Sequence, residues 1–168
     1  EKWDDMNLKE DLLRGIYAYG FENPSDIQKK AITPIIKGKD VIAQAQSGSG
    51  KTGSFAISLL ERIDLTRKET QALILSPTHE LVKQTCKVVE DIGRQLDGLV
   101  VKTLIGGTSI RDDAYDLHSN TPHVVVGSVG RVLDMFQKNY LYGNSLKILI
   151  LDEADEMLSQ GFSEKIRI

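Results

Sequence analysis

The sequence predicts an α/β fold, in which one parallel β-sheet carries helices on both faces. Short runs rich in Val, Ile and Leu alternate with longer amphipathic segments, and this alternation is typical of parallel strands joined by crossover helices. A glycine-rich loop follows the first apolar run, and an acidic pair follows the last. Because ligands of such sheets bind beyond the carboxyl ends of the strands, we expect both motifs to lie in one site.

The expected strands are the buried apolar runs, which span residues 40–45, 72–76, 100–105, 123–127 and 147–151. Three stretches between them predict helices. One begins at Lys51, directly after the glycine-rich loop. The other two have apolar or small side chains at helical spacing, at Leu81, Thr85, Val88, Ile92 and Leu96 in one and at Val129, Leu133 and Phe136 in the other.

Length and composition indicate one globular domain. The chain has 168 residues, of which 40% are hydrophobic and 27% charged. Cys86 is the only cysteine, so an internal disulfide is excluded and a reducing compartment is favoured. We expect the cytoplasm, with the nucleus as the alternative, and no membrane association. The net charge of −3 excludes a broad basic coat, so any nucleic acid would need a local groove.

The glycine-rich loop predicts phosphate binding. Gly48 and Gly50 allow backbone N–H groups to turn inward, toward a point that also faces the positive end of the helix at Lys51. Lys51 would neutralise the β- and γ-phosphates, and the Thr52 hydroxyl would bind Mg²⁺. The alternative is a surface turn before a helix. The predicted cradle comprises Ala45, Gln46, Ser47, Gly48, Ser49, Gly50, Lys51 and Thr52, with Ala45 where the usual pattern has Gly.

The acidic pair at the end of the last strand predicts hydrolysis of a nucleoside triphosphate. Asp152 would approach Mg²⁺ through water, and Glu153 would position or deprotonate the attacking water. The alternative is an acidic helix N-terminus, which the helix dipole favours on its own. With Lys51, these two carboxylates form the expected catalytic set.

Six segments in this order resemble the DEAD-box RNA helicases. They are residues 20–28, 45–52, 77–81, 105–107, 128–131 and the sequence Asp-Glu-Ala-Asp at 152–155. The resemblance covers residues 1–168 and implies the N-terminal RecA-like half of such an enzyme, ending before the family's Ser-Ala-Thr motif. A second RecA-like half with an arginine finger would complete it, and this half alone would be nearly inactive. The resemblance also implies that Asp155 couples the two halves.

The resemblance further implies an adenine site near the N-terminus. Gln28 offers the amide donor and acceptor that adenine requires, and Phe21 would stack on the base. Trp3 stands at the family's upstream aromatic position, where it would brace this segment as part of the cofactor site. For Phe21 and Trp3 the alternative is a packing role. ATP and Mg²⁺ are therefore the expected cofactors.

Three further motifs are predicted to bind RNA through its sugar–phosphate backbone. Helix-start N–H groups, hydroxyls and an Arg hold phosphates without reading bases, and contacts to 2′-hydroxyls favour RNA over DNA. As alternatives, Thr78 and Ser128 would be helix caps, and the Gly pair a turn. The predicted RNA contacts are Pro77, Thr78, His79, Gly106, Gly107, Ser128, Gly130 and Arg131.

Two positions depart from the family pattern. The family usually has Arg where His79 stands, and Thr-Pro where Ser128-Val129 stands. Because histidine is mostly neutral near pH 7, one fixed phosphate partner is either lost or made pH-dependent, and Val129 lacks the rigid first turn that Pro provides. His118, His123 and Cys86 are interpreted as structural.

Residues 13–20 and 152–161 most closely resemble the translation initiation factor 4A branch of the family, which implies an ATP-dependent RNA helicase that unwinds short duplexes in mRNA. Its expected partners are RNA of any sequence, the second RecA-like domain and translation initiation scaffold proteins. One alternative is an RNA clamp of the exon-junction type. The other is a non-enzymatic RNA- or partner-binding scaffold, against which the retention of Lys51, Thr52, Asp152 and Glu153 argues.

Overall fold

The computed structural model describes residues 2–24, 32, 41–45 and 51–152, with the backbone alone for 41–45 and Lys51. Within these residues, five strands form one parallel sheet in the order β1-β5-β2-β4-β3. The predicted α/β fold is confirmed, and every strand boundary lies within one residue of its prediction. The strands are β1 (Val41–Ala45), β2 (Ala72–Leu75), β3 (Val101–Leu104), β4 (Val124–Gly127) and β5 (Ile148–Asp152).

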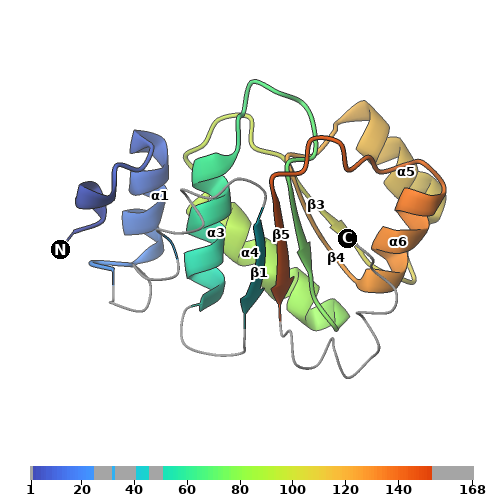
Figure 1. Ribbon diagram of the computed structural model, residues 1–168, viewed down its shortest axis with the longest axis horizontal. Helices are drawn as coiled ribbons and strands as arrows, with labels where there is room; N and C mark the ends of the chain where they lie inside the picture. The colour runs from blue at the N-terminus through green and yellow to red at the C-terminus, as the bar shows by residue number, and fades with distance from the viewer. Residues whose placement is uncertain (1, 25–31, 33–40, 46–50, 153–168) are drawn as a thin grey trace.

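Helices cover both faces of the sheet (Figure 1). Side chains alternate along each strand, so that Ala72 and Ile74 of β2 belong to one hydrophobic cluster whereas Leu73 and Leu75 belong to the other. The first cluster includes the apolar faces of α1, α3 and α4, and the second those of α5 and α6. The helices are η1 (Trp3–Met6), α1 (Glu10–Tyr19), α3 (Lys51–Arg62), α4 (His79–Ile92), α5 (Ile110–Ser119) and α6 (Val129–Gln137).

Helix α4 begins and ends where its sequence provides caps. The Thr78 hydroxyl accepts a hydrogen bond from the Leu81 N–H at 3.2 Å, which satisfies one of the donors left free at a helix start. The helix ends at Ile92, before Gly93, so the predicted extension to Leu96 is wrong. Glycine is an unfavourable residue within a helix, and Leu96 instead packs into the core from the turn that follows.

Helix α6 is confirmed, but the side chains that it buries are Val132 and Met135. The predicted residues Val129, Leu133 and Phe136 are only half-buried. Helices α1 and α5 were not predicted. In α5 the residues that are buried are Leu117 and a charged side chain, Asp113, so its apolar pattern is too weak to show in the sequence.

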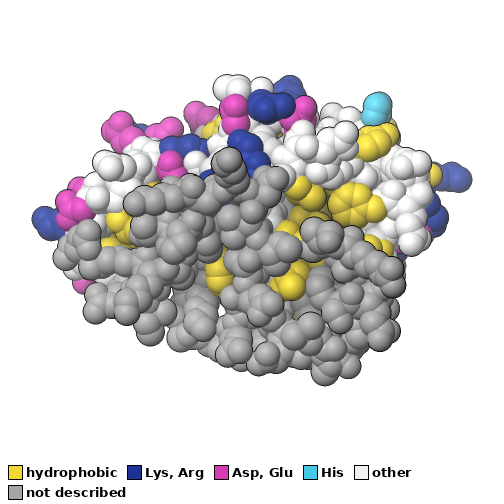
Figure 2. All heavy atoms as spheres, in the orientation of Figure 1, with side chains coloured by type: hydrophobic (Ala, Val, Ile, Leu, Met, Phe, Trp, Pro, Cys, Tyr) yellow, Lys and Arg dark blue, Asp and Glu magenta, His cyan; other side chains and the backbone are white. Residues whose placement is uncertain are grey.

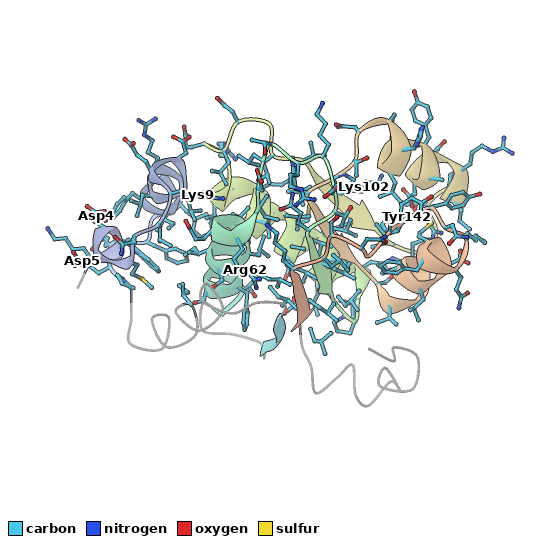
Figure 3. The ribbon with its side chains drawn as sticks, turned by 45° about the horizontal axis from the view of Figure 1, so that its top comes forward. Asp4, Asp5, Lys9, Arg62, Lys102 and Tyr142 are labelled. Atoms are coloured by element: carbon cyan, nitrogen blue, oxygen red, sulfur yellow. The ribbon has the colours of Figure 1, made fainter. Side chains whose placement is uncertain are left out.

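Helix α1 is fastened to the end of α3 by Lys9, which lies between the two helices (Figure 3). Its ammonium donates hydrogen bonds to the carbonyl oxygens of Leu60, at 3.0 Å, and Ile63. These carbonyls lie at the C-terminal end of α3, where a cation is favoured. Burial lowers the pKa of Lys9, while the nearby charges of Glu61 and Asp64 act in the opposite direction.

Over the residues described, none of the helices combines the length and the apolar character needed to span a membrane. On the face shown in Figure 2, acidic and basic side chains are interspersed over the described upper edge.

Candidate nucleotide and RNA site

The two predicted nucleotide motifs meet at one edge of the sheet. Ala45, the last residue of β1, lies directly opposite Asp152, the last residue of β5, in the parallel register. Helix α3 begins at Lys51, and its first turn lies at the end of the sheet to which the strands point (Figure 1). The expectation that both motifs lie beyond the carboxyl ends of neighbouring strands therefore holds for their described parts.

Several predicted residues lie outside the described part of the chain, and their roles stay predictions. These are Gln28, Gln46, Ser47, Gly48, Ser49, Gly50, Glu153 and Asp155, together with the side chains of Ala45 and Lys51.

Asp152 is buried and held by two hydroxyl groups. Its Oδ2 accepts hydrogen bonds from Ser76 Oγ at 3.1 Å and from Thr85 Oγ1 at 2.8 Å. The exposed fractions of these three residues are 5% for Asp152, 0% for Ser76 and 4% for Thr85. Ser76 follows β2, the strand beside β5, and Thr85 lies in α4. The carboxylate is therefore fixed from a neighbouring strand and from a covering helix.

This strand end suits Mg²⁺ bound together with a nucleotide. Asp152 and the half-buried Thr52 offer oxygen atoms, which are the ligands that Mg²⁺ prefers. Among the residues described, no group of three or more His, Cys, Asp and Glu side chains could hold a metal ion. The remaining ligands of such an ion would come from phosphates and water, as is usual for Mg²⁺ at nucleotide sites.

Phe21 packs against the first turn of α3, beside the predicted phosphate loop. A Cβ atom added at Gly53 would lie 2.8 Å from Cζ of Phe21, so this glycine lets the ring approach the helix backbone. The ring centroid of Phe21 is 6.2 Å from that of Trp3 and 5.0 Å from that of Tyr19. Phe21 is half-buried, whereas Trp3 is 0% exposed. The structure thus supports a bracing role for Trp3, in place of direct contact with a nucleotide, and leaves stacking by Phe21 a prediction.

The three predicted RNA motifs surround one surface hollow of about 500 Å³. Segments far apart in the sequence contribute to it: the start of α4, the turn after β3 and the first turns of α6. The imidazole of His79 reaches toward this turn, since its Nε2 lies 3.7 Å from the position of a Cβ at Gly106. The residues that line the hollow are His79, Gly106, Ser128, Gly130, Arg131, Leu133, Asp134 and Gln137.

The alternative interpretation of these motifs, with Thr78 and Ser128 as helix caps and the Gly pair as a turn, agrees in part with the structure. Thr78 caps α4 with its side chain, whereas Ser128 occupies the N-cap position of α6 without a capping hydrogen bond from its side chain. Gly107 has a φ of +87°, in the left-handed region that favours glycine, so the Gly pair does form a turn. The start of α6 leaves backbone N–H groups at the hollow, which are donors suited to phosphate oxygens.

Arg131 is held by an ion-pair network beneath the hollow. Its Nη1 lies 2.8 Å from Oδ2 of Asp113, and the exposed side-chain fractions of this pair are 9% and 7%. Nη2 donates to the carbonyl oxygen of Thr108 at 2.9 Å, which anchors the loop that follows Gly107. The other carboxylate oxygen of Asp113 lies 3.0 Å from Nζ of Lys102. The guanidinium is thus already paired, and its role as a phosphate contact stays a prediction.

Of the three residues interpreted as structural, His123 and Cys86 have contacts that support this interpretation. The buried His123 accepts a hydrogen bond at Nδ1 from the Val100 N–H at 3.1 Å, and burial lowers its pKa. The thiol of Cys86 lies 3.2 Å from Oε1 of Glu90, and burial, followed by this hydrogen bond, raises its pKa to about 12. His118 is exposed on α5.

Sequence reasoning missed the roles of Ser76, Thr85 and Asp113. The signal for Thr85 was a hydroxyl at a position where the helical pattern places apolar residues. A buried polar side chain requires a partner, so a threonine within an apolar stripe indicates a hydrogen bond to another element. Asp113 gave no such signal, since acidic residues are common in the first turn of a helix.

Comparison with known proteins places these features in a family. Residues 25–168 match the family model described as DEAD/DEAH box helicase. The chain is 57% identical over 166 residues to the ATP-dependent RNA helicase eIF4A of Pyricularia oryzae and 58% identical to that of Neurospora crassa. These alignments cover 99% of the chain and 41% of each relative.

Solved structures agree with the sequence relatives. A DEAD box protein from the hyperthermophile Methanococcus jannaschii has a TM-score of 0.87 and 37% identity, covering 98% of this chain and 44% of that one. Dbp5 L327V of S. cerevisiae, bound to RNA and ADP BeF3, has a TM-score of 0.84 and 33% identity, covering 98% and 41%.

The fold and the strand-end motifs define a RecA-like P-loop domain. The chain belongs to the DEAD/DEAH box helicase family. It is similar to eIF4A helicases over nearly its whole length, and it spans about two fifths of the length of these relatives.

Proposed function

We propose that the protein is an ATP-dependent RNA helicase of the eIF4A type, which opens short duplexes in mRNA during translation initiation. The observation that supports this most is the placement of two sites on one edge of the sheet. Ala45 and Asp152 meet at the ends of β1 and β5, and the hollow predicted to bind RNA lies at the starts of α4 and α6. Both helices follow strands of the same sheet.

At the nucleotide site, Lys51 would neutralise phosphate charge, while Thr52 and Asp152 would hold Mg²⁺. When bound, Mg²⁺ supplies positive charge that stabilises the transferring phosphoryl group. Glu153 would orient and deprotonate the attacking water. Gln28 would select adenine by its amide group, with Phe21 stacked on the base. The buried setting of Asp152 strengthens these electrostatic interactions, because they act in a low local dielectric.

At the RNA site, backbone N–H groups, the Ser128 hydroxyl and His79 would hold sugar and phosphate groups without reading bases. Such contacts suit an enzyme that acts on RNA of any sequence. A second RecA-like domain would close over ATP and RNA, with Asp155 coupling the two halves. It would contribute an arginine finger, whose effect in related phosphoryl transfer is roughly 10³–10⁵ in rate.

Translation initiation scaffold proteins are the proposed partners, and the cytoplasm is the proposed compartment. The chain is 57–58% identical to eIF4A helicases in alignments that cover 99% of its length. This similarity favours the eIF4A assignment rather than a clamp of the exon-junction type or a non-enzymatic scaffold.

The test is unwinding of a short RNA duplex by the full-length protein. ATP should support strand separation, whereas omission of ATP should not. The variant Glu153→Gln should bind ATP and RNA yet lose multiple-turnover unwinding, because it lacks the carboxylate that activates water. Unwinding at equal rates with and without ATP, or by Glu153→Gln at the original rate, would contradict the proposed function.

A further inference from the structure

A buried hydrogen-bonded cluster joins the nucleotide edge to the helix that leads to the RNA hollow. Its centre is Oδ2 of Asp152, which accepts hydrogen bonds from Ser76 Oγ at 3.1 Å and Thr85 Oγ1 at 2.8 Å. All three side chains are at most 5% exposed. Hydrogen bonds to a carboxylate are among the stronger ones in proteins, and burial strengthens them further.

Both hydroxyls donate to the same carboxylate oxygen. Two donors from different elements fix the side-chain rotamer of Asp152, because another rotamer would leave two buried hydroxyls without this acceptor. With Oδ2 occupied by these two donors, we expect Oδ1 to be the oxygen that meets a ligand beyond the strand end. The two hydroxyls would then determine which carboxylate oxygen is presented to Mg²⁺ and its water.

The same cluster is continuous with the RNA-facing segments. Ser76 directly precedes Pro77, and its N–H donates to the carbonyl oxygen of Gly127 at 3.0 Å. The next residue, Ser128, donates its N–H to Leu104 at 2.9 Å, at the end of β3. Thr85 lies in α4, six residues after His79. These hydrogen bonds connect the segments around the hollow to the carboxylate of Asp152.

We propose that Ser76 and Thr85 are positioning residues, which orient Asp152 toward Mg²⁺ and couple the binding of Mg²⁺-nucleotide to the binding of RNA. This inference rests on the proposed function, since it takes Asp152 as one of the residues that hold Mg²⁺, directly or through water. The coupling is reciprocal: if RNA favours the oriented carboxylate, then Mg²⁺-nucleotide raises RNA affinity by the same factor.

The test uses the full-length protein and a double variant, Ser76→Ala with Thr85→Val, which removes both hydroxyls and preserves the shape at Thr85. Thr70→Val is the matched control, because Thr70 is also buried, at 6% exposed, and its hydroxyl donates at 2.9 Å to the Pro122 carbonyl rather than to Asp152. Thr85→Ser retains the hydroxyl and serves as the conservative variant.

Two ratios are measured for each protein: the affinity for ADP with Mg²⁺ relative to that with EDTA, and the affinity for single-stranded RNA with and without Mg²⁺ and ADP–beryllium fluoride. The double variant should lose at least about tenfold in the first ratio, because it removes two hydrogen bonds to a charged group and the loss of one already corresponds to about tenfold. Its affinity for ADP in EDTA should be unchanged. Its second ratio should fall toward one. Thr70→Val and Thr85→Ser should keep both ratios.

Ratios in the double variant equal to those of Thr70→Val would overturn the inference while the proposed function stands. If the double variant lost as much ADP affinity in EDTA as it does with Mg²⁺, the inference would also be overturned, because the two hydroxyls would then have only a structural role. A wild-type protein whose ADP binding does not depend on Mg²⁺ would overturn the proposed Mg²⁺ role of Asp152, and this inference with it, whereas the helicase function itself is tested separately by duplex unwinding.

Discussion

Asp113 is predicted to be the ion-pair residue whose replacement destabilises this domain most clearly. It pairs with Arg131 and Lys102, and the exposed side-chain fractions are 9% for Arg131, 23% for Lys102 and 7% for Asp113 itself. Burial alone would lower the pKa of Lys102, but hydrogen bonds and charges of Asp116 and Asp113 raise it above its usual value. Replacing Asp113 with Asn therefore leaves two cations in poorly solvated positions.

The expected loss follows from burial. Removal of one partner from a buried ion pair costs roughly 3–5 kcal/mol, and the lower end applies because Lys102 keeps Asp116 at 2.9 Å. We expect Asp113→Asn to lose about 3 kcal/mol of unfolding free energy, a fall in Tm of roughly 6–12 °C for a domain of this size. Asp116→Asn is the matched control. Asp116 is 51% exposed, so its pair with Lys102 is expected to contribute only about 0–1 kcal/mol.

Urea and thermal unfolding of the two variants and the wild type measure this difference. Asp113→Asn should also weaken RNA binding, because Arg131 and Thr108 anchor the loop after Gly107. Equal and small losses of stability for the two variants would refute the argument from burial.

Three further outcomes are expected. His79→Arg should tighten RNA binding at neutral pH and steepen its dependence on log salt by about 0.7, one phosphate contact on a single strand; an unchanged slope would remove His79 from the RNA surface. Because burial lowers the pKa of His123, the stability that its neutral form contributes should be complete above about pH 6.5 and should be lost on acidification. Between about pH 7 and 5.5, Tm should therefore fall more in the wild type than in His123→Asn. Parallel curves of Tm against pH for the two proteins would contradict this prediction. ADP should bind more tightly than GDP, with a smaller difference in Gln28→Ala, and equal affinities in the wild type would exclude adenine recognition by Gln28.

The sheet could be predicted from sequence because three of its strands, β2, β4 and β5, are buried on both faces over nearly all their length. Runs such as 148–151 are therefore apolar at every position, and the alternation with helices settles their parallel direction. Helix α5 was not predicted, because its buried side includes the charged residue Asp113. The partners of Asp113, Arg131 and Lys102, belong to other elements. No local pattern encodes such a pairing.

The site likewise has a part that the sequence predicts and a part that it does not. The loop at 45–52 and Asp152 stand in local motifs, whose placement at adjacent strand ends follows from the fold. The hydroxyls of Ser76 and Thr85 are 76 and 67 residues from Asp152 in sequence, and only the folded arrangement brings them to it.

The most direct test of the account is RNA-stimulated ATP hydrolysis by the full-length protein, compared with Lys51→Ala. The account predicts that single-stranded RNA raises the rate of ATP hydrolysis several-fold and that Lys51→Ala abolishes both the basal and the stimulated rate, while circular dichroism and Tm remain those of a folded protein. Hydrolysis that does not respond to RNA, or that survives in a folded Lys51→Ala variant, would contradict it.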